Sequence, residues 1–126
     1  MTNNETKKKI LVVEDDEDSR QALCTIIEGL GYSFISFASG PDALSGIKDQ
    51  QLDLALVDIM MPQMSGYEFL AELRKLAEFK DLPVIMVTAK DDDSEILEGY
   101  QYGADYYITK PYTSKQLQYG IKLYID

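Results

Sequence analysis

The chain has 126 residues, with 22 acidic and 12 basic side chains, no histidine, no tryptophan and one cysteine, which gives a formal charge of −10. This length suits one domain, and an apolar content of 45% can form one core without disulfides. A single thiol, Cys24, and the lack of histidine exclude a disulfide framework and a Cys/His zinc site. The negative charge argues against direct binding to nucleic acid or to anionic membrane surfaces.

The N-terminal segment is polar and differs from the rest of the chain. Residues 1–9 contain no apolar stretch of the kind found in secretory signals, so we predict a polar tail followed by one domain at 10–126. No apolar run elsewhere approaches the roughly 20 residues needed to span a bilayer. These features predict a soluble, cytoplasmic protein without membrane contact.

The first half of the chain alternates short apolar runs with helical periodicity. Residues 10–13 form a non-alternating, β-branched run, which is typical of a strand buried on both faces. Apolar residues then recur three and four positions apart, which predicts a helix with Ala22, Leu23 and Ile26 in the core. Residues 34–37 form a weaker second strand, and residues 39–48 a short helix.

The second half repeats this alternation. In order, we predict a strand at 54–57, a helix after Ser65, a strand at 84–87, a helix at 94–102, a strand at 106–108 and a final helix containing Leu117, Ile121 and Tyr124. Five β–α units with right-handed crossovers form an open, doubly wound sheet. The predicted class is therefore α/β, a flavodoxin-like (βα)5 sandwich with a five-stranded parallel sheet and helices on both faces.

Polar side chains follow four of the predicted strands. Glu14 and Asp15 follow the first strand, Asp58 the third, Thr88 the fourth and Lys110 the fifth. Any one of them has an ordinary alternative role, because aspartates cap helices, threonines occupy turns and lysines lie in solvent. Ligands of doubly wound sheets, however, bind beyond the carboxyl ends of the strands. Their joint placement therefore predicts a functional site at this edge.

The chemistry of this group predicts a metal-dependent phosphoryl acceptor. Two carboxylates about 4 Å apart repel by about 4 kcal/mol at an effective dielectric of 20, and a divalent cation removes this cost. Oxygen-only ligands favour Mg²⁺, for which Mn²⁺ could substitute. A cation, the ammonium of Lys110 and the hydroxyl of Thr88 are groups that stabilise a transferring phosphoryl. An aspartate can form an acyl phosphate, and Asp58, on the central buried strand, is the predicted acceptor.

Four segments carry these residues. They are residues 10–16 (ILVVEDD), 56–66 (LVDIMMPQMSG), 87–89 (VTA) and 103–111 (GADYYITKP). In sequence, order and spacing, the segments resemble the receiver domain of two-component response regulators, and the length is similar to that of the single-domain chemotaxis type. The resemblance extends over almost the entire chain. It implies that a histidine kinase or a histidine phosphotransfer protein phosphorylates Asp58 in a Mg²⁺-dependent reaction, and that the chain then switches conformation to control a partner or an output domain.

The resemblance also implies individual roles. Mg²⁺ would be bound by Asp15, Asp58, the backbone carbonyl of Met60 and, through water, Glu14. Phosphoryl oxygens would be bound by Thr88, the backbone of Ala89 and Lys110. The switch would consist of Thr88 and Tyr107, and the phosphoryl lifetime would depend on Met60 and Lys90. A cis peptide is implied before Pro111. Asp16 is interpreted as a loop or helix-cap residue.

Two surfaces are candidates for protein contacts. The helix at 94–102, the fifth strand and the last helix could present Ile96, Tyr100, Tyr107 and Tyr119 to a second copy of the chain or to a target, since aromatic residues are enriched in interfaces. The alternative is that these are scattered surface residues with no partner. In the family that the chain resembles, the first helix is the expected docking face for the kinase.

Other classes of protein remain as alternatives. A flavodoxin would need hydroxyls and backbone amides in the first loop, whereas residues 14–18 are almost wholly acidic. A haloacid-dehalogenase phosphatase would need a second carboxylate two positions after Asp58, where this chain has Met60. A nucleotide triphosphatase would need a P-loop, which the sequence lacks. A receiver that only binds partners would normally have lost the acceptor, the acid pair or the lysine. The chain could be a complete regulator or part of a longer protein.

Overall fold

The computed structural model describes residues 7–89 and 103–126, and these contain a five-stranded sheet in the order β2-β1-β3-β4-β5. The strands are β1 (Lys9–Val13), β2 (Ser33–Phe37), β3 (Leu54–Asp58), β4 (Val84–Thr88) and β5 (Tyr106–Thr109). Every neighbouring pair is parallel. The predicted doubly wound α/β fold is confirmed, and each strand begins and ends within one residue of its predicted range.

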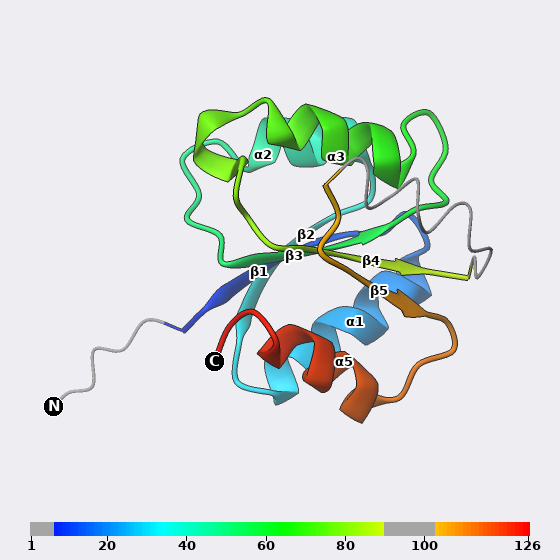
Figure 1. Cartoon of the computed structure of the whole chain (residues 1–126). Helices are drawn as coiled ribbons and strands as arrows, with labels where there is room; N and C mark the ends of the chain where they lie inside the picture. The colour runs from blue at the N-terminus through cyan, green and yellow to red at the C-terminus, as the bar shows by residue number, and fades with distance from the viewer. Residues whose placement is uncertain (1–6, 90–102) are drawn as a thin grey trace, which may run out of the picture.

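Helices cover both faces of the sheet. They are α1 (Glu17–Gly29), α2 (Gly40–Gly46), α3 (Gly66–Arg74), the short 3-10 helix η1 (Ala77–Phe79) and α5 (Ser114–Lys122). Figure 1 shows α2 and α3 on one face and α1 and α5 on the other. The helix predicted at 94–102 lies outside the described residues. Among the residues that are described, no helix is long and apolar enough to cross a bilayer.

The central strands β3 and β4 are buried on both faces of the sheet. Every residue of β3 and β4 is buried. Because side chains alternate along a strand, Val57 packs in the half of the core beneath α2 and α3, whereas Leu56 packs in the half beneath α1 and α5. Burying a Val, Leu or Ile side chain contributes about 1.5–3 kcal/mol. The strand that ends on Asp58 is therefore held on both faces.

Side-chain caps fix where helices begin after the loops. The Asp16 carboxylate accepts a hydrogen bond from the backbone N–H of Ser19 at 2.9 Å, so Asp16 is the N-cap of α1, in agreement with its interpretation as a cap. Ser65 and Glu68 form a capping box at the start of α3. Such caps typically contribute about 1 kcal/mol each. The Asp16 cap adjoins the loop that carries Glu14 and Asp15, and the Ser65 cap ends the loop that follows Asp58.

One sequence-based prediction about a buried helix residue was wrong, and one helix is shorter than predicted. Ala22 is exposed, and the buried residues of α1 are Leu23, Cys24 and Ile27. Ala22 is small and apolar and fits the periodic pattern, but the helix is rotated so that its neighbour Leu23 faces the sheet. The helix predicted at 39–48 ends at Gly46, because Ile47 is its C-cap and donates its N–H to the Ala43 carbonyl.

Candidate functional site

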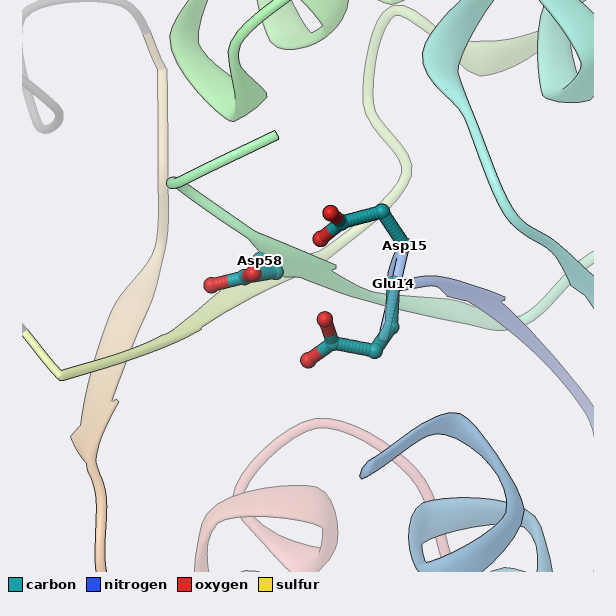
Figure 2. A group of neighbouring side chains, drawn as sticks. All are labelled: Glu14, Asp15 and Asp58. Atoms are coloured by element: carbon teal, nitrogen blue, oxygen red, sulfur yellow. The ribbon is translucent and has the colours of Figure 1, made fainter. Parts of the chain in front are cut away.

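Three carboxylates meet at the carboxyl ends of β1 and β3. Val13 and Val57 are paired in register, so the residues that follow them lie side by side. One carboxylate oxygen from each of Glu14, Asp15 and Asp58 lies within 4.8 Å of the others. Figure 2 shows the three side chains extending to the same side of the strand ends. The structure thus brings together the acidic residues that the sequence analysis selected.

The three carboxylates differ in their access to water. Glu14 is 1% exposed and Asp58 is 6% exposed, whereas Asp15 lies on the surface. Asp58 also accepts a hydrogen bond from the backbone N–H of Met60. Two of the carboxylates in the cluster, Glu14 and Asp58, are therefore buried, and the third, Asp15, is in contact with water. Asp15 is thus the most accessible of the three carboxylates.

Thr88 and Lys110 complete the group at the same sheet edge. Thr88 ends β4 and is fully buried, and its carbonyl accepts a hydrogen bond from the Lys110 backbone N–H at 2.7 Å. The Lys110 ammonium donates to Glu14 Oε1 at 2.9 Å, which makes an ion pair with a buried carboxylate. The peptide bond between Lys110 and Pro111 is cis, as the resemblance implied.

The electrostatics of Asp58 favour a cation. Burial, followed by the negative charge of Glu14, raises the pKa of Asp58 to about 7, although the positive charge of Lys110 and the Met60 N–H act in the opposite direction. Burial also opposes the charge of Lys110, but the hydrogen bond to Glu14 and the charges of Asp58 and Glu14 give it a raised pKa. The single positive charge of Lys110 therefore does not neutralise the negative charge of the acidic cluster.

The donor set fits a hard divalent ion. The three acidic side chains offer oxygen ligands only, and their oxygens are close enough to share one ion. Magnesium is bound in proteins by one or two carboxylates together with waters, and the exposed side at Asp15 leaves room for these. The residues present are thus suitable for Mg²⁺.

Sequence reasoning missed Arg20, which supports the acidic loop. Its guanidinium donates to the Glu14 carbonyl at 2.9 Å and to the Asp15 carbonyl at 3.5 Å. These contacts fix the backbone from which both acidic side chains extend. A signal was present, because Arg20 is the only basic residue between Lys9 and Lys48.

Sequence reasoning also missed Tyr67, at the start of α3. Its hydroxyl accepts a hydrogen bond from the Tyr107 hydroxyl at 3.3 Å. Tyr67 is buried and Tyr107 is half-buried. The pairing joins residues 40 positions apart, so no local pattern in the sequence could reveal it.

The remaining predicted residues are placed as follows. Met60 is 56% exposed, Ala89 is exposed, and Tyr119 is 64% exposed on α5. Lys90, Ile96 and Tyr100 lie outside the described residues. The roles of the Met60 carbonyl and the Ala89 backbone, the effects of Met60 and Lys90 on phosphoryl lifetime, and the interface stay predictions.

A family model matches most of the chain. The model described as "Response regulator receiver domain" matches residues 10–122. The chain therefore belongs to the response regulator receiver domain family of two-component signal transduction systems. This membership disfavours the flavodoxin, phosphatase and triphosphatase alternatives.

Curated relatives are longer than this chain. A probable transcriptional regulator, ycf27, of Porphyridium aerugineum is 42% identical over 116 residues, which are 92% of this chain and 47% of that protein. The phosphate regulon transcriptional regulatory protein PhoB of Escherichia coli is 35% identical over 115 residues, which are 91% of this chain and 50% of that protein. The chain thus spans about half the length of the curated relatives it matches.

Solved structures share the fold over nearly the whole chain. The chemotaxis protein CheY4 of Vibrio cholerae has a TM-score of 0.92 at 27% identity, with 95% of this chain and 100% of that chain covered. The receiver domain of a sensor histidine kinase from Pseudomonas aeruginosa has a TM-score of 0.87 at 27% identity, with 95% of this chain and 98% of that chain covered. In that structure a magnesium ion is coordinated in the active site cleft.

Proposed function

We propose that this chain is a phosphoacceptor receiver in which Asp58 carries the phosphoryl group. The observation that supports the proposal best is the placement of a nearly buried carboxylate beside Glu14 and Asp15, at the same sheet edge as Thr88 and Lys110. These 126 residues contain no histidine, so the phosphohistidine is supplied from outside this sequence, by a histidine kinase or a histidine phosphotransfer protein.

Mg²⁺, or Mn²⁺ in its place, would be held by Asp15, Asp58, the Met60 carbonyl and, through water, Glu14. When bound, the ion screens the clustered carboxylates and stabilises negative charge on phosphoryl oxygens. This proposal is supported by the oxygen-only donor set and by the magnesium ion in the Pseudomonas aeruginosa receiver.

Transfer follows from the position of Asp58. One of its carboxylate oxygens attacks the phosphorus of the donor, the P–N bond to the donor imidazole breaks, and an acyl phosphate forms. Lys110, now paired with Glu14, would donate instead to a phosphoryl oxygen, together with the Thr88 hydroxyl and the Ala89 backbone N–H. Water later attacks the phosphorus, and the P–O bond to Asp58 breaks with release of inorganic phosphate. The chain assists both steps on itself and acts as a switch.

The switch would depend on Thr88 and Tyr107. Phosphorylation adds a charge of about −1.5 to −2 and three acceptor oxygens. Movement of the Thr88 hydroxyl towards these oxygens would free space that the Tyr107 ring enters. The surface of β5 and α5 would then change its shape and its affinity for partners.

The partners follow from this cycle. The donor protein would dock on α1, which lies beside the acidic loop. The exposed Tyr119 supports use of the β5 and α5 surface for a target, an output domain or a second copy of this chain. Because curated relatives named transcriptional regulators are about twice as long, we propose that DNA contacts, where they occur, are made by other domains than this acidic one.

Intact-mass analysis tests the proposed acceptor. Incubation with acetyl phosphate and Mg²⁺ is expected to add one phosphoryl group to the parent chain, and to add none to Asp58→Asn or when EDTA replaces Mg²⁺. Asp81→Asn, which alters an exposed aspartate outside the site, is the matched control and should be modified like the parent. An adduct of equal yield on Asp58→Asn, or none on the parent, would refute the proposal.

A further inference from the structure

Arg20 lies in the first turn of α1, and its side chain contacts the acidic loop that precedes the helix. Its backbone N–H donates to the Asp16 carbonyl at 2.9 Å, which ties Arg20 to the residue that caps α1. Its guanidinium donates to the Glu14 carbonyl at 2.9 Å and makes a longer contact of 3.5 Å with the Asp15 carbonyl. Charged donors form stronger hydrogen bonds than neutral ones. One side chain therefore holds two consecutive peptide groups of the loop.

These two peptide groups lie on either side of the Asp15 Cα atom. The Glu14 carbonyl belongs to the peptide group before Asp15, and the Asp15 carbonyl belongs to the peptide group after it. Because each peptide group is planar, holding both of them restricts the backbone dihedrals of Asp15 and hence the direction of its Cα–Cβ bond. The Asp15 side chain is exposed, so packing does little to orient it. Arg20 thus orients the Asp15 carboxylate through the backbone.

The side chain of Glu14 is positioned in a different way. Its Oε1 accepts a hydrogen bond from the Lys110 ammonium at 2.9 Å, and its Oε2 accepts one from the Asp16 backbone N–H at 3.1 Å. Glu14 is also 1% exposed, so the surrounding atoms restrict its side chain. Glu14 is therefore held by contacts of its own carboxylate, whereas the direction of Asp15 depends on the loop backbone. Loss of the Arg20 guanidinium should affect Asp15 most.

We propose that Arg20 is a positioning residue for the divalent-cation site. It keeps a carboxylate oxygen of Asp15 within 4.8 Å of one of Asp58 (Figure 2) and thereby raises the affinity for Mg²⁺. The inference rests on the proposed function, in which Asp15 and Asp58 bind the ion. Groups that orient metal ligands typically change metal affinity by about 10- to 100-fold. The charge of Arg20 acts in the opposite direction, because a nearby cation repels Mg²⁺. Weaker binding after removal of this cation therefore cannot come from its charge.

The test measures the affinity of the full chain for Mn²⁺ and Mg²⁺. Electron paramagnetic resonance gives the free Mn²⁺ during titration of the metal-free chain, and competition gives the Mg²⁺ affinity. Arg20→Met keeps an unbranched side chain but removes the charge and the donors, and we expect it to bind both ions about 10-fold more weakly than the parent. Arg20→Lys keeps a charged donor without the planar fork and should recover part of the loss. Phosphorylation of Arg20→Met by acetyl phosphate should need about 10-fold more Mg²⁺ but reach nearly the parent rate at saturation.

Arg74→Met is the matched control, because Arg74 is the other arginine of the chain. Its guanidinium also donates to backbone carbonyls, those of Phe79, Leu82 and Gly103, which precede β4 and β5 at the opposite edge of the sheet. The control should lower the melting temperature in EDTA without changing the Mn²⁺ affinity of the folded chain. Mn²⁺ binding by Arg20→Met that equals or exceeds that of the parent, or equal weakening in Arg74→Met, would overturn the role of Arg20. A parent chain that binds neither ion would instead refute the metal site of the proposed function, and with it any role of Arg20 towards the ion.

Discussion

Replacing Asp58 by asparagine is expected to stabilise the metal-free chain at pH 8 and to leave its stability unchanged below about pH 4. Burial and the charge of Glu14 raise the pKa of Asp58 from 3.8 to about 7 in the folded chain. Well below pH 4 the carboxyl is protonated in both the folded and the unfolded chain. Between about pH 4 and pH 7 the Asp58 carboxyl holds a proton in the folded chain that it has released in the unfolded chain, so the free energy of unfolding falls as pH rises. Above pH 7 the full cost of the buried charge is present.

The size of the expected gain in stability follows from the pKa shift of Asp58. At about 1.4 kcal/mol per unit, the whole shift corresponds to about 4 kcal/mol, and partial hydration of the site reduces this to about 2 kcal/mol. Urea unfolding of the parent and Asp58→Asn in EDTA at pH 4, 6 and 8 measures the difference. The difference should grow with pH, whereas Asp81→Asn should show none. A difference that does not vary with pH, or a destabilised Asp58→Asn at pH 8, would contradict this account of the electrostatics.

Lys110→Ala is expected to slow phosphorylation by acetyl phosphate about 100-fold, as for the loss of a donor that stabilises developing charge. The ammonium lies 2.9 Å from Glu14 Oε1 and its charge acts on Asp58, so its removal leaves this part of the site without its cation. Initial rates of adduct formation by quenched intact-mass analysis provide the measurement. Lys80→Ala, which removes an exposed lysine after η1, is the control. Equal rates for Lys110→Ala and the parent would show that Lys110 does not contact the phosphoryl group.

The sheet and the main residues of the site were predictable because they obey simple rules. Runs of buried β-branched residues define β1, β3 and β4, and parallel strands place their carboxyl ends at one edge. Glu14, Asp58 and Thr88 follow from these two facts alone. The ion pair between Lys110 and Glu14 could not be predicted in this way, because it depends on the orientation of a long side chain that reaches across the sheet edge.

Other features depend on three-dimensional contacts that leave little trace in the sequence. The sequence indicates only that Tyr67 is an aromatic core residue, and the hydrogen bond between its hydroxyl and that of Tyr107 is evident only from the structure. Ala22 fits the helical repeat, yet it is exposed because the rotation of α1 is set by Leu23 and Ile27 against the sheet. Local patterns therefore identify the elements, and tertiary packing decides which of two adjacent apolar residues is buried.

The measurement that tests the central claim most directly is reductive trapping of the phosphorylated chain. Borohydride converts an acyl phosphate on aspartate into homoserine, which marks the modified position permanently. After treatment with acetyl phosphate and Mg²⁺, followed by borohydride and peptide sequencing by mass spectrometry, the account predicts homoserine at position 58 and at no other aspartate. Homoserine at Asp15 instead, or an unmodified Asp58 in a chain that carries the phosphoryl mass, would contradict it.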